Sequence, residues 1–126
     1  MLLNLDPLQS PIGIRAVAAD RVVLSSGESC CHSFLLDRAQ GLRAWSIDAG
    51  RELRPDDLLP LLASQPTLIL LGTGEQQIFP APAVLATALT QGVGLEVMNN
   101  AAAARTFNVL LSEGREVLLA MRIGDG

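Results

Sequence analysis

A glycine motif, Gly72-Thr73-Gly74, follows an apolar run and is the first feature of the sequence that could serve chemistry. Glycine lets a ligand approach the backbone closely, and free N–H groups in such a loop can hold an anion. Loops at the carboxyl ends of buried strands are also where open α/β sheets bind ligands. A dinucleotide fingerprint needs a third glycine, but residue 77 is glutamine, so a nucleotide is disfavoured. The motif predicts either a small-ligand site or a tight turn with a positive φ angle.

Polar residues near the start of a predicted helix form a second candidate group. Asn99 or Asn100 caps this helix, which runs to about Glu113. Arg105 and Asn108 are three positions apart and therefore share a helix face. If the helix begins beside the glycine motif, N–H groups of both elements face one cleft. The predicted cleft for a ligand or partner is formed by Gly72, Thr73, Gly74, Asn99, Asn100, Arg105, Thr106 and Asn108. The alternative is a capped amphipathic helix with a solvated arginine.

Several residue types that catalysis often uses are absent. The sequence has no lysine, which excludes a P-loop lysine, a Schiff-base lysine and a lysine general base. It has no tyrosine and no Gly-x-Ser-x-Gly nucleophile elbow. We therefore assign no catalytic residue and expect no cofactor.

Cys30, Cys31 and the single histidine, His32, could suggest a metal site. On a strand Cys30 and His32 share one face, but a second Cys/His pair that would complete four ligands is missing. Adjacent cysteines on a strand point to opposite faces, so a disulfide between them needs a distorted turn. We expect two reduced thiols and no metal ligands, and the role of the three residues stays open.

The composition favours a protein that binds another molecule or associates with itself. Of the 126 residues 49% are apolar and only 17% are charged, against a usual charged share of about 25%. An apolar surface favours a protein partner, self-association or an apolar groove. The net charge of −4 and the scattered arginines disfavour nucleic-acid binding. No apolar run approaches a membrane span and the first residues form no signal sequence, so we expect no membrane insertion and a cytoplasmic location.

The order of predicted elements indicates one α/β domain over residues 1–126. Strands are predicted at residues 12–19, 21–25, 30–36 and 45–47, followed by a short helix from Pro55, where Pro60 limits its length. The rest alternates: a buried strand at 67–71, a helix at 81–91, a strand at 95–98, the helix from Asn99 or Asn100 and a last strand at 115–123. An N-terminal strand meander followed by alternating helices and strands predicts a mixed, partly parallel central sheet.

An ordered set of motifs between about Ile12 and Met121 resembles one known family. The matching segments are Ser33-Phe34-Leu35-Leu36, Trp45, Leu71-Gly72-Thr73-Gly74, Gly94-Leu95-Glu96-Val97-Met98, Ala103-Ala104-Arg105-Thr106-Phe107-Asn108-Val109-Leu110 and Glu113-Gly114-Arg115. The family is that of small bacterial and archaeal domains of unknown function related to mitochondrial complex I assembly factor 3. The resemblance implies a three-layer fold with a mixed central sheet and no established enzymatic activity.

The resemblance also implies a partner-binding role, because the mitochondrial relatives help to assemble a membrane complex by binding other proteins. The family usually has Asp-Thr where this chain has Asn99-Asn100, and a tyrosine where it has Phe107. Any ligand contact made by those threonine and tyrosine hydroxyls in relatives is replaced or lost here.

Composition and resemblance together predict a non-catalytic protein-interaction or assembly-helper domain. The alternative is a small-molecule or anion binder, an enzyme included, that uses the cleft between Gly72-Thr73-Gly74 and the helix starting at Asn99. A third interpretation is a homo-oligomer with a self-complementary apolar patch.

Overall fold

A computed structural model describes residues 2–4, 12–47 and 50–124, and these residues form two sheets and three α-helices. The elements in chain order are β1 (Leu3–Asn4), β2 (Ile14–Val17), β3 (Val22–Leu24), β4 (Ser29–Cys30), β5 (Phe34–Asp37), β6 (Gly41–Ala44), the 3₁₀-helix η1 (Pro55–Leu58), α1 (Leu59–Leu62), β7 (Leu68–Gly72), α2 (Pro82–Leu89), β8 (Gly94–Met98), α3 (Asn100–Ser112) and β9 (Leu118–Met121). The predicted α/β class is therefore confirmed.

The larger sheet has five strands in the order β6-β5-β9-β7-β8. Strand β7 is parallel to both of its neighbours, β8 and β9, whereas β5 is antiparallel to β9 and β6. The smaller sheet is antiparallel in the order β1-β2-β3-β4 and contains the N-terminal meander. The prediction of a mixed, partly parallel central sheet is confirmed.

Side chains of the three inner strands, β5, β9 and β7, alternate between two hydrophobic clusters, as the pleat of a strand requires. One cluster receives Phe34, Leu36, Leu70, Leu119 and Met121, and the other receives Leu35, Ile69, Leu71, Leu118 and Ala120. Because both faces are apolar, each must be covered by another layer.

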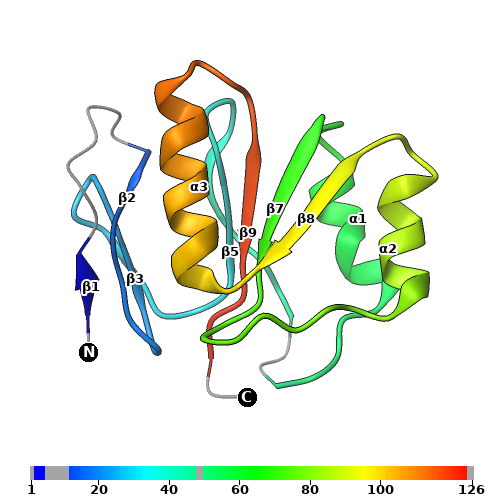
Figure 1. The fold of residues 1–126 in the computed structure, drawn as a ribbon, viewed down its shortest axis with the longest axis horizontal. Coiled ribbons are helices and arrows are strands. Elements are labelled where there is room, and N and C mark those ends of the chain that lie inside the picture. Colours follow the sequence, from blue (N-terminus) through cyan, green and yellow to red (C-terminus); the bar gives the residue numbers. More distant parts are fainter. Residues whose placement is uncertain (1, 5–11, 48–49, 125–126) are drawn as a thin grey trace.

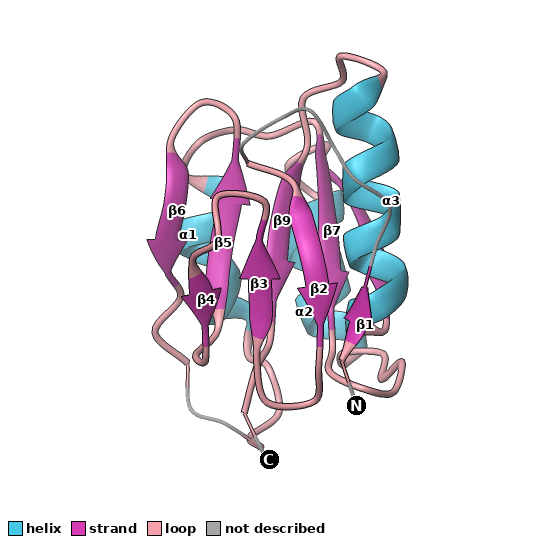
Figure 2. Cartoon of the chain, turned by 90° about the vertical axis from the view of Figure 1, so that its left-hand side faces the viewer, coloured by secondary structure: helices cyan, strands magenta, loops and turns pink. Residues whose placement is uncertain are grey.

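The two covering layers differ in kind. In Figure 1, α1 and α2 lie on one side of the five-stranded sheet, while α3 and the N-terminal strands lie on the other. Figure 2 shows the small sheet and α3 next to each other, so that together they form one layer. The buried face of α3, with Ala103 and Phe107 four residues apart, packs into the same cluster as Ile14 of β2. The three-layer arrangement implied by the resemblance is present.

Two predicted strands were wrong. Residues 30–36 do not form one strand: β4 ends at Cys30 in the small sheet, and β5 begins at Phe34 in the large one. Residues 45–47 are not a strand either, because the partner of β5 is β6, which ends at Ala44. The apolar pattern there reflects the burial of Trp45, which is 3% exposed, and not a ladder. The last strand, β9, is shorter than the predicted strand at residues 115–123, and β1 was not predicted.

Candidate functional site

Gly72 ends β7 at a point where only glycine fits. A Cβ atom at this position would collide with Oδ1 of Asn100 and with the sulfur of Met121. The Gly72 carbonyl accepts the N–H of Arg122 at 2.9 Å, which joins the end of β7 to the end of β9. The motif is therefore explained first by close packing where the parallel strands end.

The side chain of Asn100, the first residue of α3, completes this junction. Its Oδ1 accepts the N–H of Gly74 at 3.0 Å, and its Nδ2 donates to the carbonyl of Arg122 at 2.9 Å. The N–H of Thr73 donates to the carbonyl of Met98 at 2.9 Å. The N–H groups of Thr73 and Gly74 are thus used inside the protein and are not directed at an anion, and Asn99 caps α3 by accepting the N–H of Ala102.

The structure divides the predicted site residues. Gly72, Thr73, Gly74, Asn99 and Asn100 lie together at the carboxyl ends of β7 and β8. The three others lie further along α3.

Those three residues do different things. Asn108 is 9% exposed; it accepts the N–H of Ile14 at 2.8 Å and donates to its carbonyl at 2.9 Å, so it fastens β2 to α3. The hydroxyl of Thr106 contacts the sulfur of Met98 at 3.5 Å. Arg105 is exposed. Although Arg105 and Asn108 are three positions apart, one side chain faces solvent and the other the N-terminal sheet.

A cavity of about 260 Å³ opens beside the glycine motif, but α3 does not form its second wall. Its lining residues are Gly50, Arg51, Glu52, Thr73, Gly74, Ile78, Arg122, Ile123 and Gly124. A smaller cavity of about 80 Å³ shares Glu52, Thr73, Ile78 and Arg122 with it and adds Leu53, Phe79, Pro80 and Ala81. The hollow therefore lies between the loop that follows β7, the segment before η1 and the end of β9.

A third cavity, of about 680 Å³, adjoins the first and shares Gly74, Ile123 and Gly124 with it. Its lining includes Cys31 and His32, both of which are exposed. Within the described ranges no group of three or more His, Cys, Asp and Glu side chains is arranged to hold a metal ion. Burial raises the pKa of the Cys30 thiol, and the nearby charge of Glu28 raises that pKa further.

Hydrogen bonds hold the loop of residues 73–81 in place. The Thr73 hydroxyl donates to the carbonyl of Gln76 at 2.6 Å and accepts the N–H of Ile78 at 3.0 Å. The side chain of Gln77 donates to the carbonyl of Val97 in β8 at 2.7 Å. On this backbone Ile78 and Phe79 are 61% and 65% exposed. In the part of the chain that the structure describes, no other two adjacent large apolar residues are both more than half exposed.

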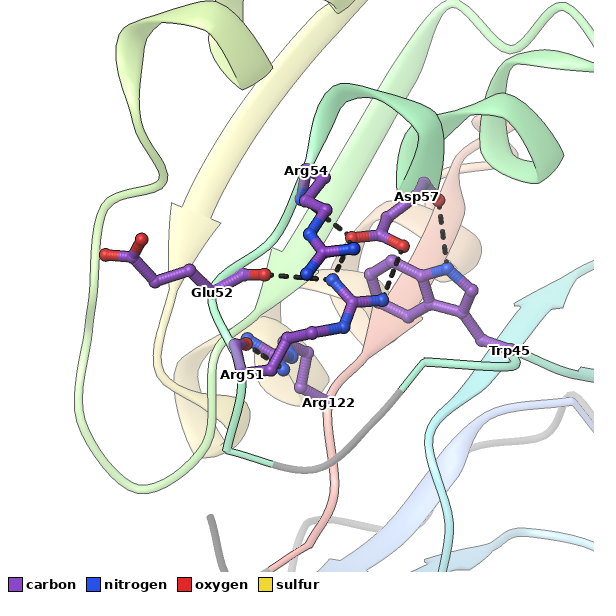
Figure 3. A network of polar contacts seen from close by, with 6 residues as sticks. All are labelled: Trp45, Arg51, Glu52, Arg54, Asp57 and Arg122. Carbon is purple, nitrogen blue, oxygen red and sulfur yellow. Dashed lines mark hydrogen bonds and ion pairs between the residues drawn. The ribbon is translucent and has the colours of Figure 1, made fainter.

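Arg51 and Arg122, which line the cavity, belong to a network of polar contacts (Figure 3). The guanidinium of Arg51 makes two contacts with the carboxylate of Asp57, at 2.8 and 2.9 Å, and the N–H of Arg54 donates to the same carboxylate at 2.7 Å. The guanidinium of Arg122 donates to the carbonyl of Arg51 at 2.6 Å. The indole N–H of Trp45 donates to the carbonyl of Asp57 at 3.1 Å. Residues 51–57 are thereby tied to β9 and to the core.

Two ionisable groups of the network have shifted pKa values. The hydrogen bond from Arg51 lowers the pKa of Asp57, against an opposing effect of burial. Burial lowers the pKa of Arg122, and the neighbouring charge of Arg51 lowers it further, while Asp57 acts in the other direction.

Sequence reasoning missed Arg51, Ile78, Phe79 and Arg122. The arginines are 71 positions apart and belong to no motif, so only the fold brings them together. The adjacent apolar pair ahead of Pro80 was the one available signal, since two large apolar residues stand there in an otherwise polar loop.

The sequence of the chain from Ile14 to Arg122 matches a family model described as "Protein of unknown function (DUF498/DUF598)", over residues 14–122. The chain belongs to this family. The matched stretch includes the glycine motif, α3 and the arginine network, whereas Ile123 and Gly124 of the cavity lining follow it directly.

Similar proteins with printed names or solved structures extend the comparison. The chain is 30% identical over 118 residues to the "13 kDa major membrane protein" of Francisella tularensis subsp. holarctica (strain LVS), covering 93% of this chain and 95% of that protein. An NMR structure from Xanthomonas campestris is 45% identical with a TM-score of 0.78, covering 89% of this chain and 84% of the other. A crystal structure from Bordetella parapertussis is 27% identical with a TM-score of 0.79, covering 94% and 100%. The two solved structures share the fold of this chain, and the printed names of all three relatives state no activity.

The Francisella name raises the question of membrane contact. Within the described ranges, no helix combines the length and the apolar character needed to cross a bilayer.

Proposed function

We propose that this chain is a non-catalytic protein-interaction domain that binds its partner along the loop of residues 73–81. The observation that carries the proposal is the exposure of Ile78 and Phe79, at 61% and 65%, on a backbone fixed by Thr73 and Gln77. Covering a large apolar side chain is worth about 1.5–3 kcal/mol. A loop that is already fixed loses little conformational entropy when a partner covers it.

The family resemblance supports a binding role. The sequence resembles small bacterial and archaeal domains that have no established enzymatic activity and are related to mitochondrial complex I assembly factor 3. Those mitochondrial relatives help to assemble a membrane complex by binding other proteins. The printed name of the Francisella relative describes that protein as a membrane protein, so membrane fractions are a sensible source of partners. The cytoplasmic location inferred from the sequence stays a prediction.

A second candidate function is the binding of a small molecule or anion. It is favoured by the cavity of about 260 Å³ with Arg51 and Arg122 in its wall. In this version the site lies between the loop after β7, residues 50–52 and residues 122–124, instead of between the loop and α3. A thermal-shift screen against metabolites and inorganic anions tests it, because a ligand of the folded state raises the melting temperature.

The protein-interaction proposal is tested by comparing surface variants in the native cell. Quantitative affinity purification with cross-linking is carried out on the wild type, on an Ile78→Ser/Phe79→Ser double variant and on Leu89→Ser. Leu89 is 76% exposed at the end of α2 and controls for the loss of any apolar surface. We expect a reproducible partner that the double variant loses and Leu89→Ser retains. Equal recovery by all three proteins would contradict the proposal.

A further inference from the structure

We propose that two copies of this chain pair through β6, antiparallel and around a two-fold axis, so that their two large sheets become one continuous sheet. β6 is the outermost strand of the five-stranded sheet and pairs only with β5 among the described residues (Figure 2). This surface uses none of residues 73–81, so it is independent of the docking loop proposed above.

Alternate residues of β6 turn their backbone groups away from β5. The N–H of Trp45 donates to the carbonyl of Ser33 at 3.0 Å, and hydrogen-bonded pairs alternate with non-bonded pairs along an antiparallel ladder. The register therefore directs the backbone groups of Arg43 toward β5 and those of Leu42 and Ala44 toward the open edge. Within the described ranges no other strand pairs with β6, so two N–H and two C=O groups there have no strand to bond.

The other three sheet edges are shorter or partly occupied. β1 and β4, the edges of the smaller sheet, have two residues each, whereas β6 has four. At the far edge of the larger sheet, the Val97 carbonyl of β8 accepts the side chain of Gln77 at 2.7 Å. Proteins commonly shorten or cover the edges of their sheets, because an open edge pairs with other chains. Among the described residues, none bonds the outward groups of β6 in this way.

The charged side chain of β6 is turned back onto its own hairpin. A charge on an edge strand often prevents pairing with another chain. Here the guanidinium of Arg43 donates to both carboxylate oxygens of Asp37, at 3.2 and 3.4 Å, and to the carbonyl of Gly41 at 3.1 Å. The arginine charge is thus balanced within the chain, which reduces the repulsion between two copies. On the opposite face of the strand, Leu42 is half-buried and Ala44 is exposed.

A second copy of this chain satisfies the edge completely. When Leu42 lies opposite Ala44 of the partner subunit, the two-fold axis passes beside Arg43 and the same pair recurs on its other side. The outward N–H and C=O groups of both copies then form four hydrogen bonds, and none of these groups is left unpaired. Each leucine also lies against an alanine, a large side chain against a small one. An unrelated strand would form the backbone bonds without this two-fold match, and so we commit to a second copy.

The test follows the mass and the amide exchange of the unaltered chain, with a reductant that keeps the thiols from cross-linking. Sedimentation equilibrium from micromolar to millimolar concentration should reach twice the mass of the chain. Hydrogen exchange at the Leu42 and Ala44 amides should slow as the concentration rises, whereas exchange at Arg43, which is bonded within the chain, should stay the same. A monomer at every concentration would overturn the inference, and so would a dimer in which neither amide slows.

A proline variant tests the edge directly. Ala44→Pro removes an outward N–H without breaking a ladder bond to β5, and it should weaken the dimer roughly 10- to 100-fold because two of the four hydrogen bonds are lost. Leu95→Pro is the matched control at the other edge of the sheet. The N–H of Gly94 donates to the carbonyl of Thr67, so the next amide, that of Leu95, points away from β7. This control should leave the dimer unchanged, and the amide spectrum of each variant confirms that it is folded.

Association through the docking loop would give a different pattern. If Ile78→Ser/Phe79→Ser dissociates the dimer while Ala44→Pro does not, the copies meet at the loop and the inference about β6 is wrong. If Ala44→Pro dissociates the dimer and the double variant keeps it, β6 is the interface, and the loop stays available to another protein.

Discussion

Asn100 and Gly74 are joined by two hydrogen bonds that run in opposite directions. The N–H of Gly74 donates to the Asn100 side chain at 3.0 Å, and the N–H of Asn100 donates to the carbonyl of Gly74 at 2.7 Å. The first turn of α3 is thereby fixed to the loop that follows β7. Because the Asn100 side chain also donates to the carbonyl of Arg122, one buried amide holds three chain segments together.

The first prediction concerns this amide. Asn100→Ala should lower the free energy of unfolding by about 1–3 kcal/mol, because it leaves the partly buried Gly74 N–H and Arg122 carbonyl without their side-chain partner. Asn99→Ala is the control, since it removes only the helix cap and should cost about 1 kcal/mol. Urea denaturation measures both. A smaller loss for Asn100→Ala than for Asn99→Ala would show that the junction is not important for stability.

The second prediction concerns the packing of Gly72. Gly72→Ala forces apart the Asn100 side chain and the sulfur of Met121, and overpacking of this kind costs about 1–3 kcal/mol. Gly94→Ala is the matched control, because its Cβ would first meet the flexible end of Leu68 at 3.3 Å. Thermal denaturation of both variants should rank Gly72→Ala as the less stable. The reverse order would contradict this account of the motif.

The third prediction concerns the two hydrogen bonds by which the Asn108 side chain of α3 holds Ile14 of β2. Asn108→Ala leaves the N–H and the carbonyl of Ile14 without their side-chain partner in a buried position. We expect a stability loss of about 1–3 kcal/mol and faster hydrogen exchange at the Ile14 amide. Val109→Ala, one residue along and 53% exposed, should stay within about 0.5 kcal/mol of the wild type. If hydrogen exchange at the Ile14 amide is unchanged in Asn108→Ala, these two hydrogen bonds do not hold β2 to α3.

The fourth prediction is a pH dependence that arises from Asp57. Its pKa is lowered in the folded protein, chiefly by the hydrogen bond from Arg51, so the ionised form is favoured by folding. The resulting stability is fully present above the unfolded pKa of about 4 and is lost as the pH falls through the lower folded value. Urea midpoints between pH 7 and pH 3 should therefore fall more steeply for the wild type than for Asp57→Asn. If the urea midpoints of the two proteins fall in parallel with pH, ionisation of Asp57 does not contribute to the pH dependence of stability.

The fifth prediction concerns the two thiols. Cys31 is exposed, whereas burial raises the pKa of Cys30 and so reduces its thiolate fraction. Iodoacetamide at pH 8 should alkylate Cys31 first, and Cys31→Ser should react slowly while Cys30→Ser reacts at the wild-type rate. Peptide mass spectrometry at timed intervals assigns the sites. Preferential labelling of Cys30 would show that burial does not control reactivity here.

The sequence predicted the second half of the fold well, because each element there is bounded by residues with a clear local effect. Pro82 starts α2, Asn99 caps α3, and the continuous apolar run of β7 indicates a strand buried on both faces. In the first half, β2 and β3 lie inside predicted strands, but residues 30–36 are divided between two sheets and residues 45–47 form no strand. The Trp45 ring is buried outside any strand, and its indole N–H donates a hydrogen bond to the carbonyl of Asp57.

The position of the glycine motif beside the start of α3 could also be predicted, since both follow neighbouring parallel strands. The rest of the site could not. Strand order places β9 between β5 and β7, and this brings Arg122 next to Arg51. No local pattern encodes such a neighbour. The separation of Arg105 from Asn108 likewise depends on the N-terminal sheet, which covers one side of α3 but not the other.

The place of β9 in the sheet has a consequence for biosynthesis. This strand is the middle one of five, yet the ribosome makes it after all four of its companions. Until residues 118–121 have left the exit tunnel, the inward-facing edges of β5 and β7 have no strand to pair with, and both hydrophobic clusters lack the residues that β9 contributes. The nascent chain therefore completes its large sheet only after β9 has emerged. During that interval the unpaired edges of β5 and β7 can pair with strands of other chains, which makes the incomplete sheet prone to aggregation.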